Sequence, residues 1–206
     1  MLTIKSIPNR LKELVRPLLP KDRLLTPEAS NRDPSQLGEA KIVGLIIECL
    51  TKQGCNIPKS FLEIGANSPY HLSSSWYLEK SLGFEGVSID PISDLSFQFS
   101  KYRPKTKFIN KAFSSSLPRL NQISFYRDRV GVLILDIESL TLQLDALREI
   151  IKTNLKPFLI CVETLDFSPS SANLRSKYDS LLGQDYTLAA GTYLNSIYTC
   201  KSLLAC

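Results

Sequence analysis

The sequence has no long uninterrupted apolar segment. Its longest candidate, residues 42–50, contains Glu48 and is much shorter than the roughly 20 apolar residues that a transmembrane helix needs. The first 20 residues also lack the continuous apolar segment that follows the positive charges of a secretion signal. We therefore expect no transmembrane helix and a cytoplasmic location.

Cysteine and histidine are too few and too scattered for a structural metal site. The chain has 5 Cys, none in a C-x-x-C pair, and a single histidine, His71. Structural zinc sites need a Cys/His cluster, so no metal is expected. Cys161 lies in the apolar run FLICV and should be a small buried hydrophobe, whereas the terminal Cys206 should be exposed. We expect reduced thiols with no catalytic role.

The composition lacks the bias of disordered, collagen-like or disulfide-rich chains: 43% of the 206 residues are hydrophobic and 22% are charged. Residues 1–33 contain many prolines and few strand patterns, so we expect an N-terminal arm followed by one domain over residues 34–206. Residues 7–18 could form a short helix with one apolar face. This face would pack on the domain or a partner subunit, or lie on an anionic membrane.

Residues 60–200 alternate between short apolar runs and helix-length segments, a pattern typical of a parallel sheet covered on both faces. A capping-box pattern at residues 33–36 predicts a preceding helix that ends near Gly54. Strands are expected near 60–65, 86–90, 107–111, 131–136 and 158–163, helices near 72–82, 92–102, 140–153 and 170–182, and a terminal antiparallel hairpin over 186–190 and 194–200.

One segment is strongly basic. Residues 101–129 contain eight Lys or Arg and one acid, Asp128. Such a segment could attract an anionic substrate, a nucleic acid or a lipid headgroup. The alternative is a solvated edge of the sheet that lysines protect against pairing.

Polar residues follow the expected strands where ligands bind to doubly wound sheets. The first strand ends in FLEIGANSP, where Glu63 precedes Gly65 and the glycine lets a ligand approach the backbone. Taken alone, this turn is equally consistent with a structural role. The second strand ends at Asp90, which could accept hydrogen bonds from both hydroxyls of a ribose or could cap a helix ahead of Pro91.

Phosphate-binding motifs are missing. The chain has neither G-x-G-x-x-G nor G-x-x-x-x-G-K-[ST], which argues against dinucleotides and nucleoside triphosphates. Instead, Asp136 and Glu138 follow the fourth strand, and Glu163 ends the fifth. These carboxylates could converge in one crevice, orient an amine or act as a base, and Asp136 or Glu138 could alternatively cap the next helix.

These segments together resemble the FkbM family of S-adenosylmethionine-dependent class I methyltransferases. The resemblance covers residues 60–200 and rests on FLEIGANSPYHLSSSWYLEKSLGFEGVSIDP, FINKAFS, LILDIESL, FLICVET and GTYLNSIYTC. It implies a three-layer, Rossmann-like α/β fold with a mainly parallel seven-stranded sheet and a C-terminal antiparallel strand. The Gly-Ala-Asn-x-Pro loop resembles one subgroup of this family.

The resemblance also implies the site. The residues expected to bind S-adenosylmethionine are Glu63, Gly65, Ala66, Asn67, Asp90, Pro91 and Ile92. Asp136 and Glu138 would lie beside the methyl group and the acceptor, and His71 is a further candidate base. The family's later loop glycine is Pro69 here, Ser139 replaces the usual glycine after Glu138, and Thr141 stands where an acid is common.

The sequence thus predicts an S-adenosylmethionine-dependent O-methyltransferase, acting on a sugar hydroxyl of a glycan or glycosylated metabolite. Tyr70 and Trp76 could shape the acceptor pocket or pack the first helix of the domain on the sheet. The departures at Ser139 and Thr141 keep a non-catalytic binding module open. A nucleic-acid methyltransferase is a weaker alternative, because the basic segment lacks interleaved aromatic residues.

Overall fold

The computed structural model describes residues 35, 38–113, 130–153, 155–164, 171–192 and 194–203, with the backbone alone at 171–174. Seven strands form one mixed sheet in the order β3-β2-β1-β4-β5-β7-β6. The strands are β1 (Ser60–Ile64), β2 (Glu85–Asp90), β3 (Lys107–Asn110), β4 (Val132–Leu135), β5 (Leu159–Glu163), β6 (Tyr186–Gly191) and β7 (Asn195–Cys200). The strand order reverses between β1 and β4, which is where doubly wound sheets open a ligand crevice.

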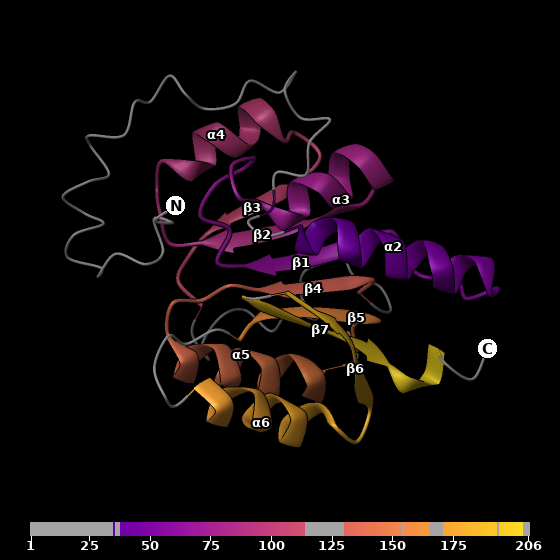
Figure 1. Cartoon of the computed structure of the whole chain (residues 1–206). Helices are drawn as coiled ribbons and strands as arrows, with labels where there is room; N and C mark the ends of the chain where they lie inside the picture. Colours follow the sequence, from indigo (N-terminus) through magenta and orange to yellow (C-terminus); the bar gives the residue numbers. More distant parts are fainter. Residues whose placement is uncertain are drawn as a thin grey trace. The chain divides into compact units, whose positions relative to one another are not determined.

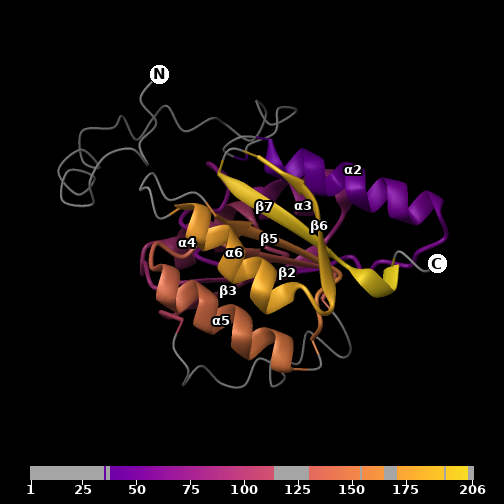
Figure 2. The same cartoon turned by 60° about the horizontal axis from the view of Figure 1, so that its bottom comes forward.

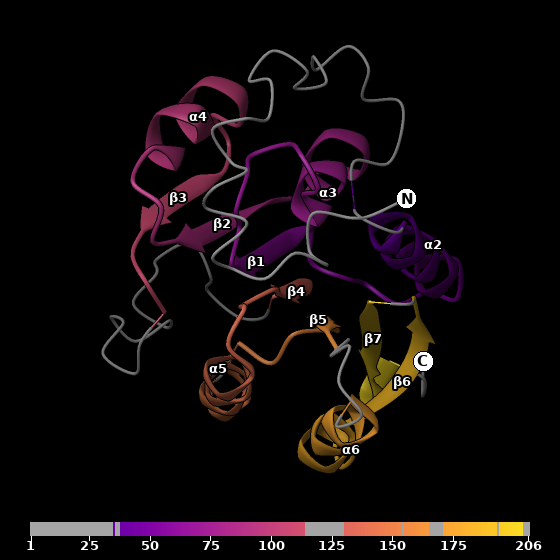
Figure 3. The same cartoon turned by 60° about the vertical axis from the view of Figure 1, so that its left-hand side comes forward.

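Helices cover both faces of this sheet. They are α2 (Glu39–Lys52), α3 (Ser74–Leu82), α4 (Leu95–Tyr102), α5 (Leu140–Lys152) and α6 (Ser171–Leu182), with a short 3₁₀ helix, η6 (Lys201–Leu203), after β7. Figure 1 shows the strands between two groups of helices. The turned views agree that α2, α3 and α4 lie on one face and α5 and α6 on the other (Figures 2 and 3). This is the three-layer arrangement that the sequence predicts.

The register aligns the carboxyl ends of the first parallel strands. Ile64 pairs with Ile89 of β2 and with Leu135 of β4, so β1, β2 and β4 end at the same level. All three of these residues are at most 1% exposed. Their continuous apolar runs fit strands that helices cover on both sides. The residues that follow them, from 65, 90 and 136 onward, therefore meet at one edge of the sheet.

The predicted strand and helix positions are confirmed within a few residues, and β7 is antiparallel to both β5 and β6. One boundary is wrong. The helix predicted to begin at residue 34 begins at Glu39, after Gly38 in the left-handed region with φ 82°. Ser35 still contributes, because its hydroxyl accepts a hydrogen bond from the Ala40 N–H at 3.3 Å. Gly54 follows the helix, as predicted, with φ 92°.

The predictions for the N-terminal arm, for Cys206 and for most of residues 114–129 lie outside the described residues. Within the described part of the chain, no helix is both long enough and apolar enough to cross a membrane. The same residues contain no group of His, Cys, Asp and Glu that could hold a metal ion. Cys161 is 2% exposed in the core, as its apolar surroundings predict.

Candidate functional site

The turn after β1 requires glycine at position 65. Gly65 has φ 89°, in the left-handed region that side chains disfavour. A β-carbon built there would lie 2.1 Å from the carbonyl oxygen of Asp136. The Gly65 N–H donates to the Ile89 carbonyl at 2.9 Å, and the Asp136 N–H donates to the Ile64 carbonyl at 3.0 Å. Main-chain contacts therefore join the ends of β1, β2 and β4 at this turn.

Asp90 ends β2 and connects two loops through its carboxylate. Oδ2 accepts a hydrogen bond from the Asn67 N–H and Oδ1 accepts one from the Ile92 N–H, both at 2.9 Å. A carboxylate has about four acceptor positions, so roughly two remain for a ligand. The alternative that Asp90 caps a helix is wrong, because the N-cap of α4 is Asp94. The two N–H groups instead orient a carboxylate at the switch point of the sheet.

The other residues predicted to bind the cofactor lie around this carboxylate. Ala66 and Ile92 belong to one small apolar cluster with Leu95 and Phe99 of α4. Asn67, whose N–H contacts Asp90, is exposed and has φ 51°. Pro91 is exposed as well. The structure thus brings together the loop after β1 and the loop after β2, while their roles in binding remain predictions.

Glu63 lies beneath this surface in a buried polar network. Its Oε2 accepts hydrogen bonds from the hydroxyls of Ser75 at 2.7 Å and Ser88 at 2.6 Å, and its residue is 3% exposed. Burial raises the pKa of Glu63 above its ordinary value, although the charge of Arg103 and the two hydroxyls oppose this. These contacts join β1 to β2 and α3, so they account for Glu63 as a support of the turn.

Arg103 carries the positive charge of this network and is completely buried. Its Nε donates to Oε2 of Glu79 at 2.8 Å and its Nη1 donates to the Ser75 hydroxyl at 2.6 Å. The guanidinium carbon lies 5.3 Å from the ring centres of Phe61 and Phe99. Burial opposes ionisation of Glu79, but Arg103 together with Lys80 and Thr106 holds the pKa of Glu79 below its ordinary value.

The interpretation of residues 101–129 as one exposed basic segment is therefore wrong at Arg103. That residue is needed inside the protein as a counter-charge for Glu63 and Glu79. Lysines at 101, 105, 107 and 111 are exposed, and β3 is an edge strand. These facts favour the alternative of an edge that lysines protect.

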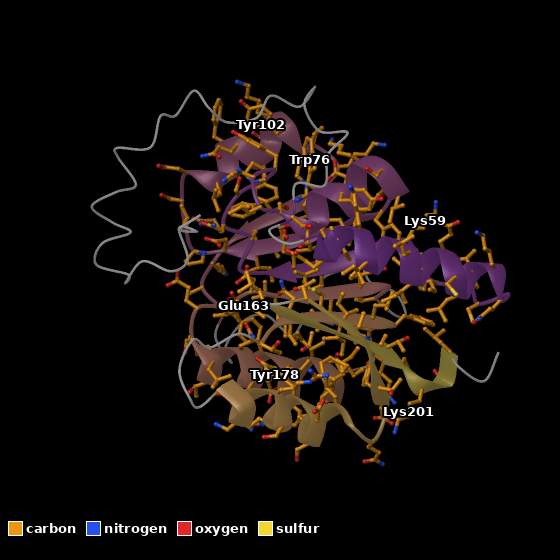
Figure 4. The ribbon with its side chains drawn as sticks, in the orientation of Figure 1. Lys59, Trp76, Tyr102, Glu163, Tyr178 and Lys201 are labelled. Carbon is orange, nitrogen blue, oxygen red and sulfur yellow. The ribbon has the colours of Figure 1, made fainter. Side chains whose placement is uncertain are left out.

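The loop after β4 places Asp136 and Glu138 at the same edge as Asp90. Asp136 is half-buried and Glu138 is exposed. Neither caps α5, so that alternative is wrong: Ser139 is the N-cap, and its hydroxyl accepts a hydrogen bond from the Leu142 N–H at 3.5 Å. Serine at this position thus has a local structural reason. Glu163 lies on the side of the sheet where β1 and β2 end, whereas Lys59 and Lys201 lie at the opposite side (Figure 4).

His71 and the aromatic residues near it differ in exposure. His71 is exposed, its N–H donates to the Ser68 hydroxyl at 3.0 Å, and partial desolvation lowers the pKa of its imidazole. Trp76 is 4% exposed and Tyr70 is 8% exposed, with an edge-to-face contact between the rings. Tyr102 meets Tyr70 in the same way, and Figure 4 shows Trp76 and Tyr102 on α3 and α4. The packing interpretation of Trp76 fits this burial.

The sequence gave no warning of several residues at this edge. Glu39, in the first turn of α2, is 4% exposed and accepts a hydrogen bond from the Ser74 hydroxyl at 3.2 Å. Burial raises the pKa of the Cys161 thiol, and the charges of Glu39 and Asp136 raise it further, which makes this thiol unreactive. Gln143 is 2% exposed and contacts the ends of β4 and β5. A charged or amide residue on an expected helix carries no sign of such long-range contacts.

Comparison with solved structures decides the type of fold. The TDP-rhamnose 3'-O-methyltransferase of calicheamicin biosynthesis aligns over 96% of this chain and 99% of its own, with 14% identity and a TM-score of 0.56. The chain has the fold of the class I methyltransferases. An O-methyltransferase from Bacillus cereus, solved with S-adenosylhomocysteine, aligns over the same shares with 15% identity and a TM-score of 0.54.

A third class I methyltransferase structure supports the same fold. The O-methyltransferase TomG from Streptomyces achromogenes, solved with S-adenosylmethionine, aligns over 79% of both chains with 15% identity and a TM-score of 0.53. No protein-family model and no curated protein matches the sequence. Membership of the FkbM family therefore stays a prediction, while the predicted Rossmann-like fold is confirmed.

Proposed function

We propose that this protein is an S-adenosylmethionine-dependent O-methyltransferase. The observation that carries the proposal is the Asp90 carboxylate at the end of β2. It lies beside the Gly65 turn, next to the point where the strand order reverses, and two main-chain N–H groups hold it in place. A carboxylate in this position can accept hydrogen bonds from two ribose hydroxyls. The class I methyltransferase fold supports the same ligand.

The residues on the page fit that ligand. Asp90 would bind the ribose, and the cluster of Ala66 and Ile92 offers an apolar contact for an adenine. Glu63 would act from below, because its described hydrogen bonds hold the strands that carry the turn. S-adenosylmethionine supplies a methyl group already activated on a sulfonium, so the protein mainly has to align the acceptor and remove its proton.

Asp136, Glu138 and His71 are the proposed proton acceptors. The lowered pKa of His71 means that its imidazole is neutral near pH 7 and able to accept a proton. Asp136 and Glu138 flank one loop at the same edge of the sheet. General-base assistance of this kind contributes typically about 10²–10⁴-fold.

For the acceptor we propose a sugar hydroxyl on a glycan or glycosylated metabolite, as in the FkbM family that the sequence resembles. The printed activity of one structural neighbour, methylation of TDP-rhamnose, supports this choice. The nucleic-acid alternative loses support because Arg103 is not available on the surface. We also propose that any subunit or membrane contact is made by the N-terminal arm, outside the cofactor crevice.

Calorimetry with S-adenosylhomocysteine and its 2'-deoxyribose analogue tests the ribose assignment. The unaltered protein should bind the deoxy compound about tenfold more weakly, since a hydrogen bond to a charged group contributes roughly 1.5–3 kcal/mol. Asp90→Ala should bind both compounds weakly and almost equally. Asp94→Ala, an exposed acid four residues later, is the matched control and should keep the tenfold difference. A difference that survives in Asp90→Ala would disprove the assignment.

A further inference from the structure

Gln143 joins three elements at the carboxyl end of the sheet. Its Oε1 accepts a hydrogen bond from the Ile137 N–H at 2.9 Å. Its Nε2 donates to the Glu163 carbonyl at 2.7 Å and to the Tyr178 hydroxyl at 2.5 Å. One buried amide thus connects the loop after β4, the last residue of β5 and helix α6.

The place of these bonds matters for the proposed site. Ile137 lies between Asp136 and Glu138, so its N–H fixes the stretch of backbone that carries both carboxylates. Both hydrogens of the Gln143 amide are used on the other side, which sets its orientation and leaves Oε1 for the loop. Hydrogen bonding of this kind, from residues that do not touch the ligand, holds site groups within the small tolerances that catalysis needs.

The partners of the amide are uncharged at physiological pH. Burial raises the pKa of Tyr178 to about 12, opposed by its bond to Gln143. Tyr178 is 0% exposed and Gln143 is 2% exposed. This connection therefore keeps its hydrogen bonds, and its geometry, across the whole range in which carboxylates and histidine titrate.

From these contacts we infer that Gln143 is a positioning residue, which holds the Asp136–Glu138 loop so that its negative charge faces the sulfonium of the methyl donor. The inference rests on the proposed function. It has a consequence that simple structural support lacks. S-adenosylmethionine carries a positive sulfur and S-adenosylhomocysteine a neutral one, so displacing the loop should weaken binding of the first compound more than of the second.

The test compares both dissociation constants by calorimetry in the full chain. Gln143→Met keeps the length of the side chain and removes its three hydrogen bonds. We expect the preference for S-adenosylmethionine over S-adenosylhomocysteine to fall roughly three- to tenfold. Tyr178→Phe removes one bond and leaves those to Ile137 and Glu163, so the preference should change less than in Gln143→Met.

Tyr186→Phe is the matched control for lost stability. It removes one buried hydrogen bond, from the Tyr186 hydroxyl to the Pro157 carbonyl at 2.8 Å, at the opposite end of β5. Its preference should equal that of the unaltered protein. If Gln143→Met weakens both compounds equally, or behaves as Tyr186→Phe does, the inference is overturned. If neither compound binds the unaltered protein, the proposed function itself fails.

Hydrogen exchange provides a second measurement that needs no variant. The Ile137 amide should exchange slowly in the unaltered protein, because it donates to a buried oxygen. An Ile137 amide that exchanges as fast as a freely exposed one would show that Gln143 does not hold the loop. This result is independent of any ligand, so it separates a failure of the contact from a failure of the proposed function.

Discussion

The two halves of the crevice are supported in different ways. Beneath the β1 and β2 ends, a buried arginine holds two buried glutamates and two serine hydroxyls. Beneath the β4 and β5 ends, a neutral glutamine and a neutral tyrosine connect the loops. Both networks carry acidic residues of the proposed site at their surface. They should respond very differently to mutation and to pH.

The difference follows from the cost of burying charge. A buried ion pair needs all its partners, because removal of one leaves an uncompensated charge in a medium that solvates it poorly. A buried amide that loses its partners leaves unpaired dipoles, at a cost of about 1–3 kcal/mol each. The β1–β2 half is therefore expected to be an all-or-none assembly, and the β4–β5 half a graded one.

The largest expected effect comes from removing the shared cation. Arg103→Met should lower the free energy of unfolding by roughly 3–5 kcal/mol, because Glu63 and Glu79 would remain buried without a counter-charge. Urea unfolding near pH 7 measures this loss. Lys105→Met, an exposed neighbour in the same basic segment, is the control and should change stability by less than about 0.5 kcal/mol.

A triple variant sharpens the same comparison. Replacing Glu63 and Glu79 by Gln in the Arg103→Met background removes the uncompensated charges, so it should recover part of the lost stability. If it is less stable than Arg103→Met alone, the network is held by shape and hydrogen bonding, and its resemblance to the neutral half would be closer than we argue.

The next effect is the pH dependence of the two glutamates, which should have opposite signs. The pKa of Glu63 is raised in the folded protein, so its contribution to stability declines as the pH rises from about 4.3, the ordinary value, to the folded pKa. The pKa of Glu79 is lowered, so its contribution is present above about 4.3 and is lost as the pH falls through the folded pKa.

Urea unfolding from pH 3 to pH 8 separates these signs. The stability of Glu63→Gln relative to the unaltered protein should increase as the pH rises above about 4.3. The relative stability of Glu79→Gln should decrease as the pH rises toward that value and then stay constant. Gln143→Met, in the neutral half, should show a constant difference throughout. Parallel curves for the two glutamate variants would contradict the assignment of the raised pKa to Glu63.

Much of the fold could be predicted from local sequence patterns. Apolar runs such as VLIL of β4 place strands, and Gly65 and Asp90 at their ends point to the ligand edge. Pairing in parallel sheets follows from this alternation and from the resemblance to a known family. The helix boundary at Glu39 could not be predicted, since Gly38 in a left-handed conformation displaced a capping box that looked adequate.

The supports of the site could not be predicted, for a physical reason. Arg103 belongs to a run of exposed lysines, and only the approach of Glu79 from α3, 24 residues earlier, decides that it is buried. Gln143 lies on a helix whose polar residues are mostly solvent-exposed. Composition reports the average environment of a segment. A single buried polar residue depends on partners that only the tertiary fold brings together.

The smallest expected effects concern the two serines that cap helices after β1 and β4. The Ser73 hydroxyl accepts from the Trp76 N–H at 3.3 Å, and Ser139 accepts from the Leu142 N–H at 3.5 Å. Ser73→Ala should cost about 1–2 kcal/mol, because Ser73 is 2% exposed and also contacts Ser75 of the charged network. Ser139→Ala should cost about 0.5–1 kcal/mol, and Ser139→Gly only a few tenths. Thermal or urea unfolding resolves these differences. Equal losses for the two alanine variants would mean that the charged half gains nothing from its cap, which would weaken the contrast between the halves.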